Sequence, residues 1–425
     1  MDQEADMGDG QLSAQVGFRR RSTSVSDDYS VQKTNDDATE CKFAAVSLNY
    51  YKDDYLKRFV LACGEHKFHR DPEISRGYWA RVTAIRSIVD AFLQLSAQVG
   101  FRRRSTSVSD DYSVQKTNDD ATECKFAAVS LNYYKDDYLK RFVLACGEHK
   151  FHRDPEISRG YWARVTAIRS IVDAFLQQVG PSCQIVNIGS GFDTLYWRLK
   201  EANARFYKFV DVDFSSVTAK KIHQIRKPGT PNLVAMFSEP PREAEHSDLH
   251  AGDYELIGAD LRQPDELKGK LELASLDFGL PTLFIAECVL VYMGVSHSGR
   301  MLAKLATWFN TAVFVNYEQV NMKDSFGEVM EKNLQQRGIV LPGLTACTNI
   351  ESQKQRFLDN HWEHVDVWTM NEIYQKKLPQ DEVKRIEAIE LLDERELLTQ
   401  LLHHYCIAIA TKGIAAKYPQ LKCFF

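Results

Sequence analysis

The sequence of 425 residues predicts an α/β protein with a mostly parallel sheet that is covered by helices on both faces. From residue 184 onward, short apolar segments alternate with segments of helical period. Several apolar segments end in an acidic residue, and the first ends in the turn Gly189-Ser190-Gly191. Alternation of this kind buries both faces of a parallel sheet, and ligands of such sheets bind beyond the carboxyl ends of the strands.

The spacing of apolar and polar residues assigns the elements in order along the chain. A helix is predicted at 157–176, where Tyr161, Trp162 and Val165 belong to an apolar face of helical spacing. It leads within a few residues into a strand predicted at 184–188. Further strands are predicted at 206–211, 254–260, 282–287, 311–317 and 405–410, and further helices at 194–200, 215–225, 296–310 and 394–404. The proline-rich segment 229–253 is predicted to be a long loop.

An internal repeat changes the domain count. Residues 11–93 recur without a single change as residues 94–176, so subtracting these 83 residues leaves 342 of independent sequence. Natural structural repeats diverge while keeping their core positions, so this is a duplicated segment and not a solenoid. We expect the second copy (94–176) to be the packed one, because its helix runs directly into the first strand. The first copy (11–93) is expected to pack poorly or to compete for the same groove.

Three segments follow from this organisation. Residues 1–123 are predicted to be a disordered tail together with the first copy, since the polar stretch through about Glu123 is rich in Ser, Thr and Asp. The arginines before serines in this tail either form a kinase site or belong to a solvated tail. Residues 124–183 are predicted to form a helical lid, and residues 184–425 the ligand-binding domain.

Composition excludes several classes of protein. The net charge of −5 and the pI near 6.2 argue against a general nucleic-acid or membrane-surface binder. No run of about 20 apolar residues predicts a membrane span, and the amino terminus does not resemble a signal peptide. The nine cysteines form no C-x-x-C pair, so neither zinc nor a disulfide framework is expected. We expect a cytoplasmic monomer that binds no metal.

The glycine turn points away from a dinucleotide. A dinucleotide fingerprint needs a third glycine where Thr194 stands, because the pyrophosphate must approach the helix amino terminus closely. The turn Gly189-Ser190-Gly191 suffices for a nucleoside without a phosphate. A tight turn that binds no ligand is the alternative.

Acidic strand ends strengthen the nucleoside interpretation. Asp211 and Asp213 end the second strand, where a carboxylate can accept both ribose hydroxyls. Asp260 ends the third strand and can hold an adenine amino group while Leu261 packs on the ring. Each aspartate taken singly can instead be a solvated strand end or a helix cap. Together with the glycine turn, these residues favour S-adenosylmethionine as the cofactor.

Glu287 ends the most apolar strand. A carboxylate in such a run is costly to bury unless a cation lies nearby. The sulfonium or the amino group of the cofactor would supply that cation, and a structural ion pair is the alternative.

From about Cys124 to Gly413 the sequence resembles the eukaryotic leucine carboxyl methyltransferases, which methylate the terminal leucine carboxylate of the protein phosphatase 2A catalytic subunit. The resemblance implies a Rossmann-like class I S-adenosylmethionine-dependent methyltransferase fold with seven strands and an amino-terminal helical lid. The segments that carry it are CKFA at 124–127, RGYWARV at 159–165, QIVNIGSGFDT at 184–194, IGADLR at 257–262, AECVLVYM at 286–293, NYEQVNM at 316–322 and HYC at 404–406.

The resemblance also implies the site residues. Family cofactor contacts correspond to Lys125, Arg164, Gly189, Asp213, Asp260, Leu261 and Glu287, with Asp211 as a weaker candidate. Tyr292 and Tyr317 are expected at the substrate mouth, with aromatic core packing as the alternative. No general base is expected, because the acceptor carboxylate is already ionised at neutral pH. Since the first copy supplies Lys42 and Arg81, either copy can cap the site.

Two other functions compete with this one. A related methyltransferase of the same family modifies a carboxylate in a tRNA base, which the net charge of −5 disfavours. The other alternative is an inactive protein that only binds the phosphatase because the duplication buries the pocket. Intact Gly189, Asp213, Asp260 and Glu287 argue against inactivity.

Overall fold

The computed structural model describes residues 38–53, 71–96, 108–143, 153–336, 339–393, 395–414 and 418. The chain divides into two compact units, residues 1–85 and residues 86–425. In the first unit, residues 38–47 are helical. Helix α2 (Pro72–Ser96) begins in the first unit and ends in the second.

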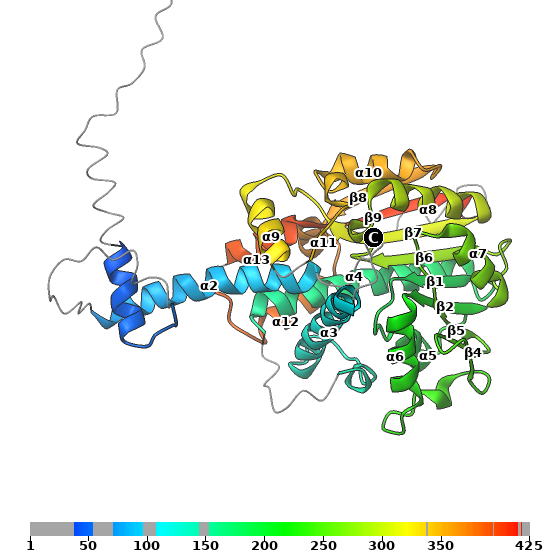
Figure 1. Ribbon diagram of the computed structural model, residues 1–425, viewed down its shortest axis with the longest axis horizontal. Coiled ribbons are helices and arrows are strands. Elements are labelled where there is room, and N and C mark those ends of the chain that lie inside the picture. Colours follow the sequence, from blue (N-terminus) through cyan, green and yellow to red (C-terminus); the bar gives the residue numbers. More distant parts are fainter. Residues whose placement is uncertain are drawn as a thin grey trace, which may run out of the picture. The chain divides into compact units, whose positions relative to one another are not determined.

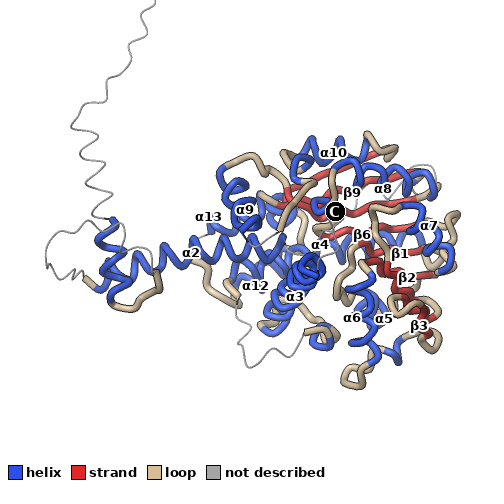
Figure 2. The backbone as a smooth tube through the Cα atoms, in the orientation of Figure 1, coloured by secondary structure: helices blue, strands red, loops and turns tan. Residues whose placement is uncertain are grey.

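A nine-stranded sheet forms the centre of the second unit (Figures 1 and 2), in the order β3-β4-β5-β2-β1-β6-β7-β9-β8. The five strands from β5 to β7 are parallel, and antiparallel pairs complete both edges. The central strands are buried along their length, as strands covered on both faces must be. The strands are β1 (Gln184–Ile188), β2 (Lys208–Asp213), β3 (Arg242–Ala244), β4 (Asp248–Ala251), β5 (Tyr254–Gly258), β6 (Thr282–Glu287), β7 (Ala312–Gln319), β8 (His364–Thr369) and β9 (Tyr405–Lys412).

The α/β fold class with a mostly parallel sheet is confirmed, but the strand number of seven is wrong. The segment 229–253, predicted as a loop, contains the short strands β3 and β4, which extend one edge beyond β5. Strand β8 was not predicted, because its burial is irregular and it pairs only with β9 at the other edge. Edge strands such as these form through a neighbouring strand, and their own sequence pattern is weak.

Helices cover the sheet on both faces. Phe314 of β7 contacts Phe357 of α10, with ring centroids 5.3 Å apart. Tyr317, three residues along the same strand, lies under Arg164 of α4 at 4.5 Å. Because alternate side chains of a strand point to opposite faces, α4 and α10 cover opposite faces of β7. The helices of the second unit are α3 (Val108–Ser130), α4 (Pro155–Val179), α5 (Leu195–Glu201), α6 (Ser215–Arg226), α7 (Pro264–Leu273), α8 (Val295–Trp308), α9 (Ser325–Gln336), α10 (Ile350–Leu358), α11 (Met370–Lys376), α12 (Gln380–Glu387) and α13 (Arg395–His403).

The amino-terminal helices of this unit differ from the prediction in one respect. Residues 108–123 are helical and belong to α3, so the prediction of disorder through about Glu123 is wrong there. Asn118 and Thr122 are buried, and α3 packs against α4. The polar composition of residues 108–123 predicts disorder, but α3 packs against α4 and Asn118 binds Phe192, which are distant in the sequence. Helix α4 also contacts α11 and α13.

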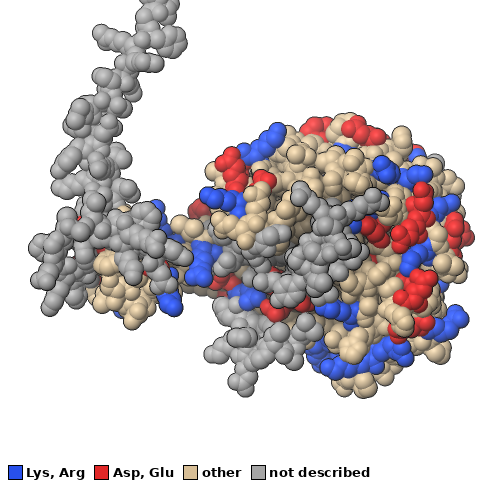
Figure 3. Space-filling model, viewed as in Figure 1, with Lys and Arg blue, Asp and Glu red and all other residues tan. Residues whose placement is uncertain are grey.

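The second unit positions a site where the strand order reverses. From β1 the chain proceeds to β2 on one side, and it returns later to β6 on the other side. The carboxyl ends of β1, β2, β5 and β6 therefore meet at one edge, where ligands of open parallel sheets bind. On the face shown in Figure 3, acidic and basic side chains are interspersed. No helix among the described residues is long and apolar enough to cross a membrane.

Candidate active site

The turn after β1 requires glycine at two positions. Gly189 and Gly191 have φ of +63° and +47°, a conformation that other residues rarely adopt. A Cβ at Gly189 would lie 2.5 Å from Cγ2 of Val289, and a Cβ at Gly191 would clash with Oδ1 of Asn118. The turn therefore offers bare backbone to a ligand, as the sequence predicts.

Asp213, at the end of β2, faces this turn. Its carboxylate accepts hydrogen bonds of 2.7 Å from the backbone N–H of Gly191 and of 2.7 Å from that of Phe214. Burial raises the pKa of Asp213 to about 6, although both N–H donors favour the ionised form. Asp211 is engaged elsewhere, since it accepts from Lys221 at 2.8 Å and from the Tyr254 hydroxyl at 2.7 Å.

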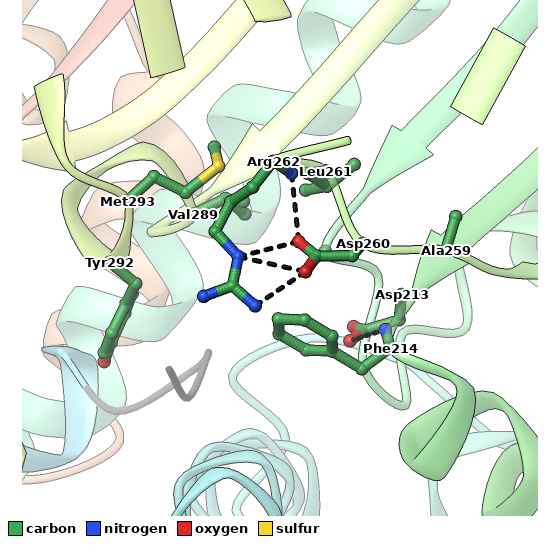
Figure 4. Close-up of a pocket in the computed structure, with 10 residues that line it drawn as sticks. Asp213, Phe214, Ala259, Asp260, Leu261, Arg262, Val289, Tyr292 and Met293 are labelled. Atoms are coloured by element: carbon green, nitrogen blue, oxygen red, sulfur yellow. Dashed lines mark hydrogen bonds and ion pairs between the residues drawn. The ribbon is translucent and has the colours of Figure 1, made fainter. Parts of the chain in front are cut away.

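Asp260 follows β5 and is paired with Arg262 (Figure 4). The guanidinium donates to both carboxylate oxygens of Asp260, with a shortest distance of 2.6 Å from Nη2 to Oδ2. The backbone N–H of Arg262 also donates to Oδ1 at 3.0 Å. These bonds fix the direction of the carboxylate at the pocket.

Two cavities meet at Gly189, which lines both. The first has about 340 Å³ of empty space, which includes open solvent at its mouth, and runs past the ends of β2 and β5. The second encloses about 270 Å³ and runs between α3 and the turn after β1. The first is lined by Gly189, Asp213, Phe214, Ala259, Asp260, Leu261, Arg262, Val289, Tyr292 and Met293, and the second by Asn118, Thr122, Lys125, Gly189, Ser190, Gly191, Phe192 and Asp193. Together they form an elongated site with acidic side chains at one end and Lys125 at the other.

Lys125, Arg164 and Glu287 form a charged cluster beside the second cavity. Arg164 Nε lies 2.5 Å from Glu287 Oε2, and Lys125 Nζ lies 3.7 Å from the same oxygen. Burial disfavours the charged guanidinium, yet Glu287, Cys288, Tyr317 and Tyr161 together outweigh burial and leave the pKa of Arg164 raised. The ion pair that the sequence analysis gave as the alternative for Glu287 is therefore present. It also fixes two cations close to where an anionic group of a ligand would bind.

Asp193 belongs to this cluster, and the sequence analysis did not nominate it. Its Oδ1 lies 3.6 Å from Lys125 Nζ and 3.6 Å from Arg198 Nη2. Burial disfavours its charge, but Lys125 and Arg198 outweigh burial and lower the pKa of Asp193 to about 2. Asp193 therefore helps to hold the Lys125 ammonium beside the turn.

The two tyrosines predicted at the substrate mouth lie in different places. Tyr292 lines the first cavity, opposite Asp213 and Phe214 in Figure 4. Tyr317 lines neither cavity and stacks on Tyr405, with ring centroids 5.2 Å apart. Its other face lies under Arg164. The contacts of Tyr317 are those of aromatic core packing, the alternative given above.

Several lining residues were not predicted. Phe214, Arg262, Val289 and Met293 lie one or two residues from nominated positions, so proximity to a nominated residue was the signal available. Asn118 had no such signal, since its segment reads as a polar tail. Its Oδ1 accepts from the Phe192 backbone N–H at 3.2 Å.

The donor set fits S-adenosylmethionine. A Cβ at Gly189 or Gly191 would fill the space over the turn. Asp213 and Asp260 lie at the end expected for the nucleoside. The cations Lys125 and Arg164 lie at the other end. The described residues contain no group of three or more His, Cys, Asp or Glu that could hold a metal ion. Fold and site together define an S-adenosylmethionine-dependent methyltransferase.

The family follows from sequence comparison. The profile described as leucine carboxyl methyltransferase matches residues 113–306. The chain is 51% identical over 318 residues to the probable leucine carboxyl methyltransferase 1 of Caenorhabditis briggsae, covering 74% of this chain and 96% of the relative. The chain belongs to the leucine carboxyl methyltransferase family.

Two further relatives show the range of the family. Leucine carboxyl methyltransferase 1 of Bos taurus is 42% identical, with 73% of this chain and 92% of the relative covered. The tRNA wybutosine-synthesizing protein 4 of Homo sapiens is 36% identical, with 71% of this chain and 44% of the relative covered. The relatives of this chain therefore carry two different names, one for leucine carboxyl methylation and one for wybutosine synthesis in tRNA.

Proposed function

We propose that this protein transfers the methyl group of S-adenosylmethionine to the α-carboxylate of the carboxyl-terminal leucine of the protein phosphatase 2A catalytic subunit, forming a methyl ester. The observation that carries the proposal is the 51% identity to a relative named leucine carboxyl methyltransferase, of which this chain covers 96%. We also propose that the enzyme is a monomer and acts in the cytoplasm.

The proposed acceptor suits a site without a general base. An α-carboxyl group has a pKa of about 3.5, so the attacking oxygen is ionised at neutral pH. Bound S-adenosylmethionine supplies a methyl group on a positively charged sulfur. Attack by a carboxylate neutralises opposite charges, so a pocket that excludes water favours this reaction more than one that separates charge. The task of the protein is to orient two reactants, which can supply roughly 7–11 kcal/mol of a barrier.

Named residues divide this task. Lys125 and Arg164 would bind the carboxylate of the cofactor, and Glu287 between them would bind its amino group. Asp213 would accept hydrogen bonds from the ribose hydroxyls, and Asp260 would accept one from the adenine amino group. Leu261, Val289 and Met293 would pack on the nucleoside and exclude water.

Radiolabelled S-adenosylmethionine tests the proposal. We expect base-labile label on the intact phosphatase 2A catalytic subunit and none on a subunit that lacks its terminal leucine. Arg164→Ala should abolish the label, whereas Arg81→Ala, the same residue in the first copy, should leave it unchanged.

A second acceptor is tested in the same experiment. The relative named for wybutosine synthesis is 36% identical to this chain, so a tRNA fraction must also be offered as a methyl acceptor. Label on tRNA and none on the phosphatase would contradict the proposal. Cofactor binding without label on either acceptor would instead support an inactive phosphatase-binding protein.

A further inference from the structure

The segment 288–294 forms one wall of the cofactor cavity. It supplies Val289, Tyr292 and Met293 to the lining, and Val289 closes over Gly189. It begins at Cys288, which has φ of +55°, and contains the 3-10 turn η4 (Leu290–Tyr292). A turn this short has few hydrogen bonds of its own, so its position depends on what lies behind it.

Two charged side chains behind the wall hold its backbone. Glu318, on β7, accepts a hydrogen bond of 2.8 Å from the N–H of Val291. Arg356, on α10, donates from Nη2 to the carbonyl oxygen of Leu290 at 3.0 Å and to Oγ of Ser298 at 3.0 Å. The carbonyl oxygen of Val291 accepts from the N–H of Gly343 at 2.8 Å. The two peptide units around Val291 are thus fixed from β7, from α10 and from the segment at Gly343.

Glu318 and Arg356 bind the backbone of the wall at shorter distances than they approach each other. Glu318 is 0% exposed and Arg356 is 6% exposed, so both carry the cost of burial. Arg356 Nη1 lies 3.9 Å from Glu318 Oε2, which is too long for a hydrogen bond. The shorter bonds, from Val291 to Glu318 and from Arg356 to Leu290, join each charge to the backbone of the wall. Stabilisation alone is a weak reason to keep such a pair, because well-packed apolar residues often serve a fold equally well.

We propose that Glu318 and Arg356 are positioning residues of the cofactor site, which fix segment 288–294 so that Val289, Tyr292 and Met293 close the cavity. Neither side chain lines the cavity, so both act through the backbone of the wall. The proposal concerns cofactor binding, and it holds whichever molecule accepts the methyl group.

The ionisation of Glu318 gives this role a distinctive pH dependence. Burial raises the pKa of Glu318 from 4.5 to about 7, while Arg356, the N–H groups of Val291 and Gln319, and Arg164 oppose this shift. Cys288, Cys347 and Cys406 are the other titratable groups that interact with it. An ionised carboxylate accepts the Val291 N–H bond more strongly than a protonated one. Cofactor affinity should therefore rise as the pH rises through 7.

Folding stability responds with the opposite sign. Because the folded-state pKa is raised, the contribution of Glu318 to stability is fully present below its ordinary pKa of 4.5 and is lost as the pH rises through about 7. A residue that only stabilised the fold would show this fall in stability with no rise in the cofactor affinity of the folded protein. A positioning residue makes the two change in opposite directions.

Calorimetric titration with S-adenosylhomocysteine tests the proposal between pH 6 and 8.5. Arg356→Met removes the hydrogen bonds to the Leu290 carbonyl and to the Ser298 hydroxyl and keeps much of the volume. We expect binding to weaken about tenfold, the effect of losing one or two such hydrogen bonds. Arg356→Lys should recover part of the affinity. Glu318→Gln should weaken binding about threefold above pH 7 and flatten the rise through pH 7. Amide exchange of residues 288–293 should accelerate in both Arg356→Met and Glu318→Gln.

A second buried pair provides the control. Lys208 Nζ lies 3.0 Å from Glu255 Oε1, both residues are buried, and neither lines the two cavities described above. Lys208→Met should lower the melting temperature and leave the affinity unchanged. Equal loss of affinity in Lys208→Met and Arg356→Met would overturn the proposal, as would native affinity in a folded Glu318→Gln whose pH dependence is unaltered. Glu318→Gln keeps the shape of the side chain, so its cofactor affinity and pH dependence test the proposal even if Arg356→Met does not fold.

Discussion

At the scale of single residues, the site is a set of charges whose partners matter as much as their identity. Arg164 is buried, paired with Glu287 and stacked over Tyr317. Asp193 and Glu287 together hold Lys125. These partners pre-order the cations before a ligand binds, which lowers the cost of ordering them on binding.

Arg164→Ala should weaken cofactor binding about 10- to 100-fold, because a charge-assisted hydrogen bond to a carboxylate contributes roughly 1.5–3 kcal/mol. The measurement is titration with S-adenosylhomocysteine. Arg81→Ala is the matched control, since Arg81 has identical sequence neighbours and is exposed. Loss of binding in Arg81→Ala alone would assign the site to the first copy.

Asp213 should make cofactor binding weaken below pH 6. Its pKa is raised from 3.8 to about 6, so its contribution to folding stability is present below about 4 and is lost as the pH rises through 6. Binding has the opposite sign, because the ionised carboxylate is the acceptor that two ribose hydroxyls require. Asp213→Asn should remove the change in affinity near pH 6, and an unchanged pH profile in this variant would contradict the assignment.

At the scale of elements, α2 and α4 begin with the same sequence in different environments. Ile157, Trp162 and Ile168 of α4 are 2%, 2% and 3% exposed. Their equivalents in α2, Ile74, Trp79 and Ile85, are 41%, 45% and 55% exposed. The apolar face is encoded identically, and at these three positions only α4 buries it.

Ile168→Ala and Ile85→Ala make a matched pair of substitutions. Removing a buried isoleucine side chain leaves a cavity, so Ile168→Ala should lower the free energy of unfolding by about 2–5 kcal/mol. Ile85→Ala should change it by no more than about 0.5 kcal/mol, as at other exposed positions. Chemical denaturation of both variants measures the difference, and equal losses would show that both copies pack.

At the scale of the whole molecule, all nominated site residues lie in the second unit, residues 86–425. A chain lacking residues 11–93 should therefore bind S-adenosylhomocysteine with an affinity within about twofold of the full chain, since no cofactor contact is removed. Titration of both chains measures this. A large loss on deletion would show that the first copy contributes to the site.

Much of the parallel sheet could be predicted, because its buried strands are short apolar runs that stand out locally. The sites at Gly189, Asp213 and Asp260 could be predicted for the same reason, since they directly follow those runs. Strands β3, β4 and β8 could not, because an edge strand is defined by its neighbour. Asn118 could not either, because its contact with Phe192 joins residues far apart in the sequence.

The sequence by itself determined that residues 72–94 and 155–177 form the same amphipathic helix, since helical period and propensity are local properties. Only the tertiary structure decided which of them buries its apolar face. Four residues separate the end of α4 from β1, and α4 packs against α3, α11 and α13. Burial requires a partner surface, and a partner surface is made by segments that are distant in the chain. That is why Arg164 lies paired with Glu287 in the site, while the identical Arg81 is exposed.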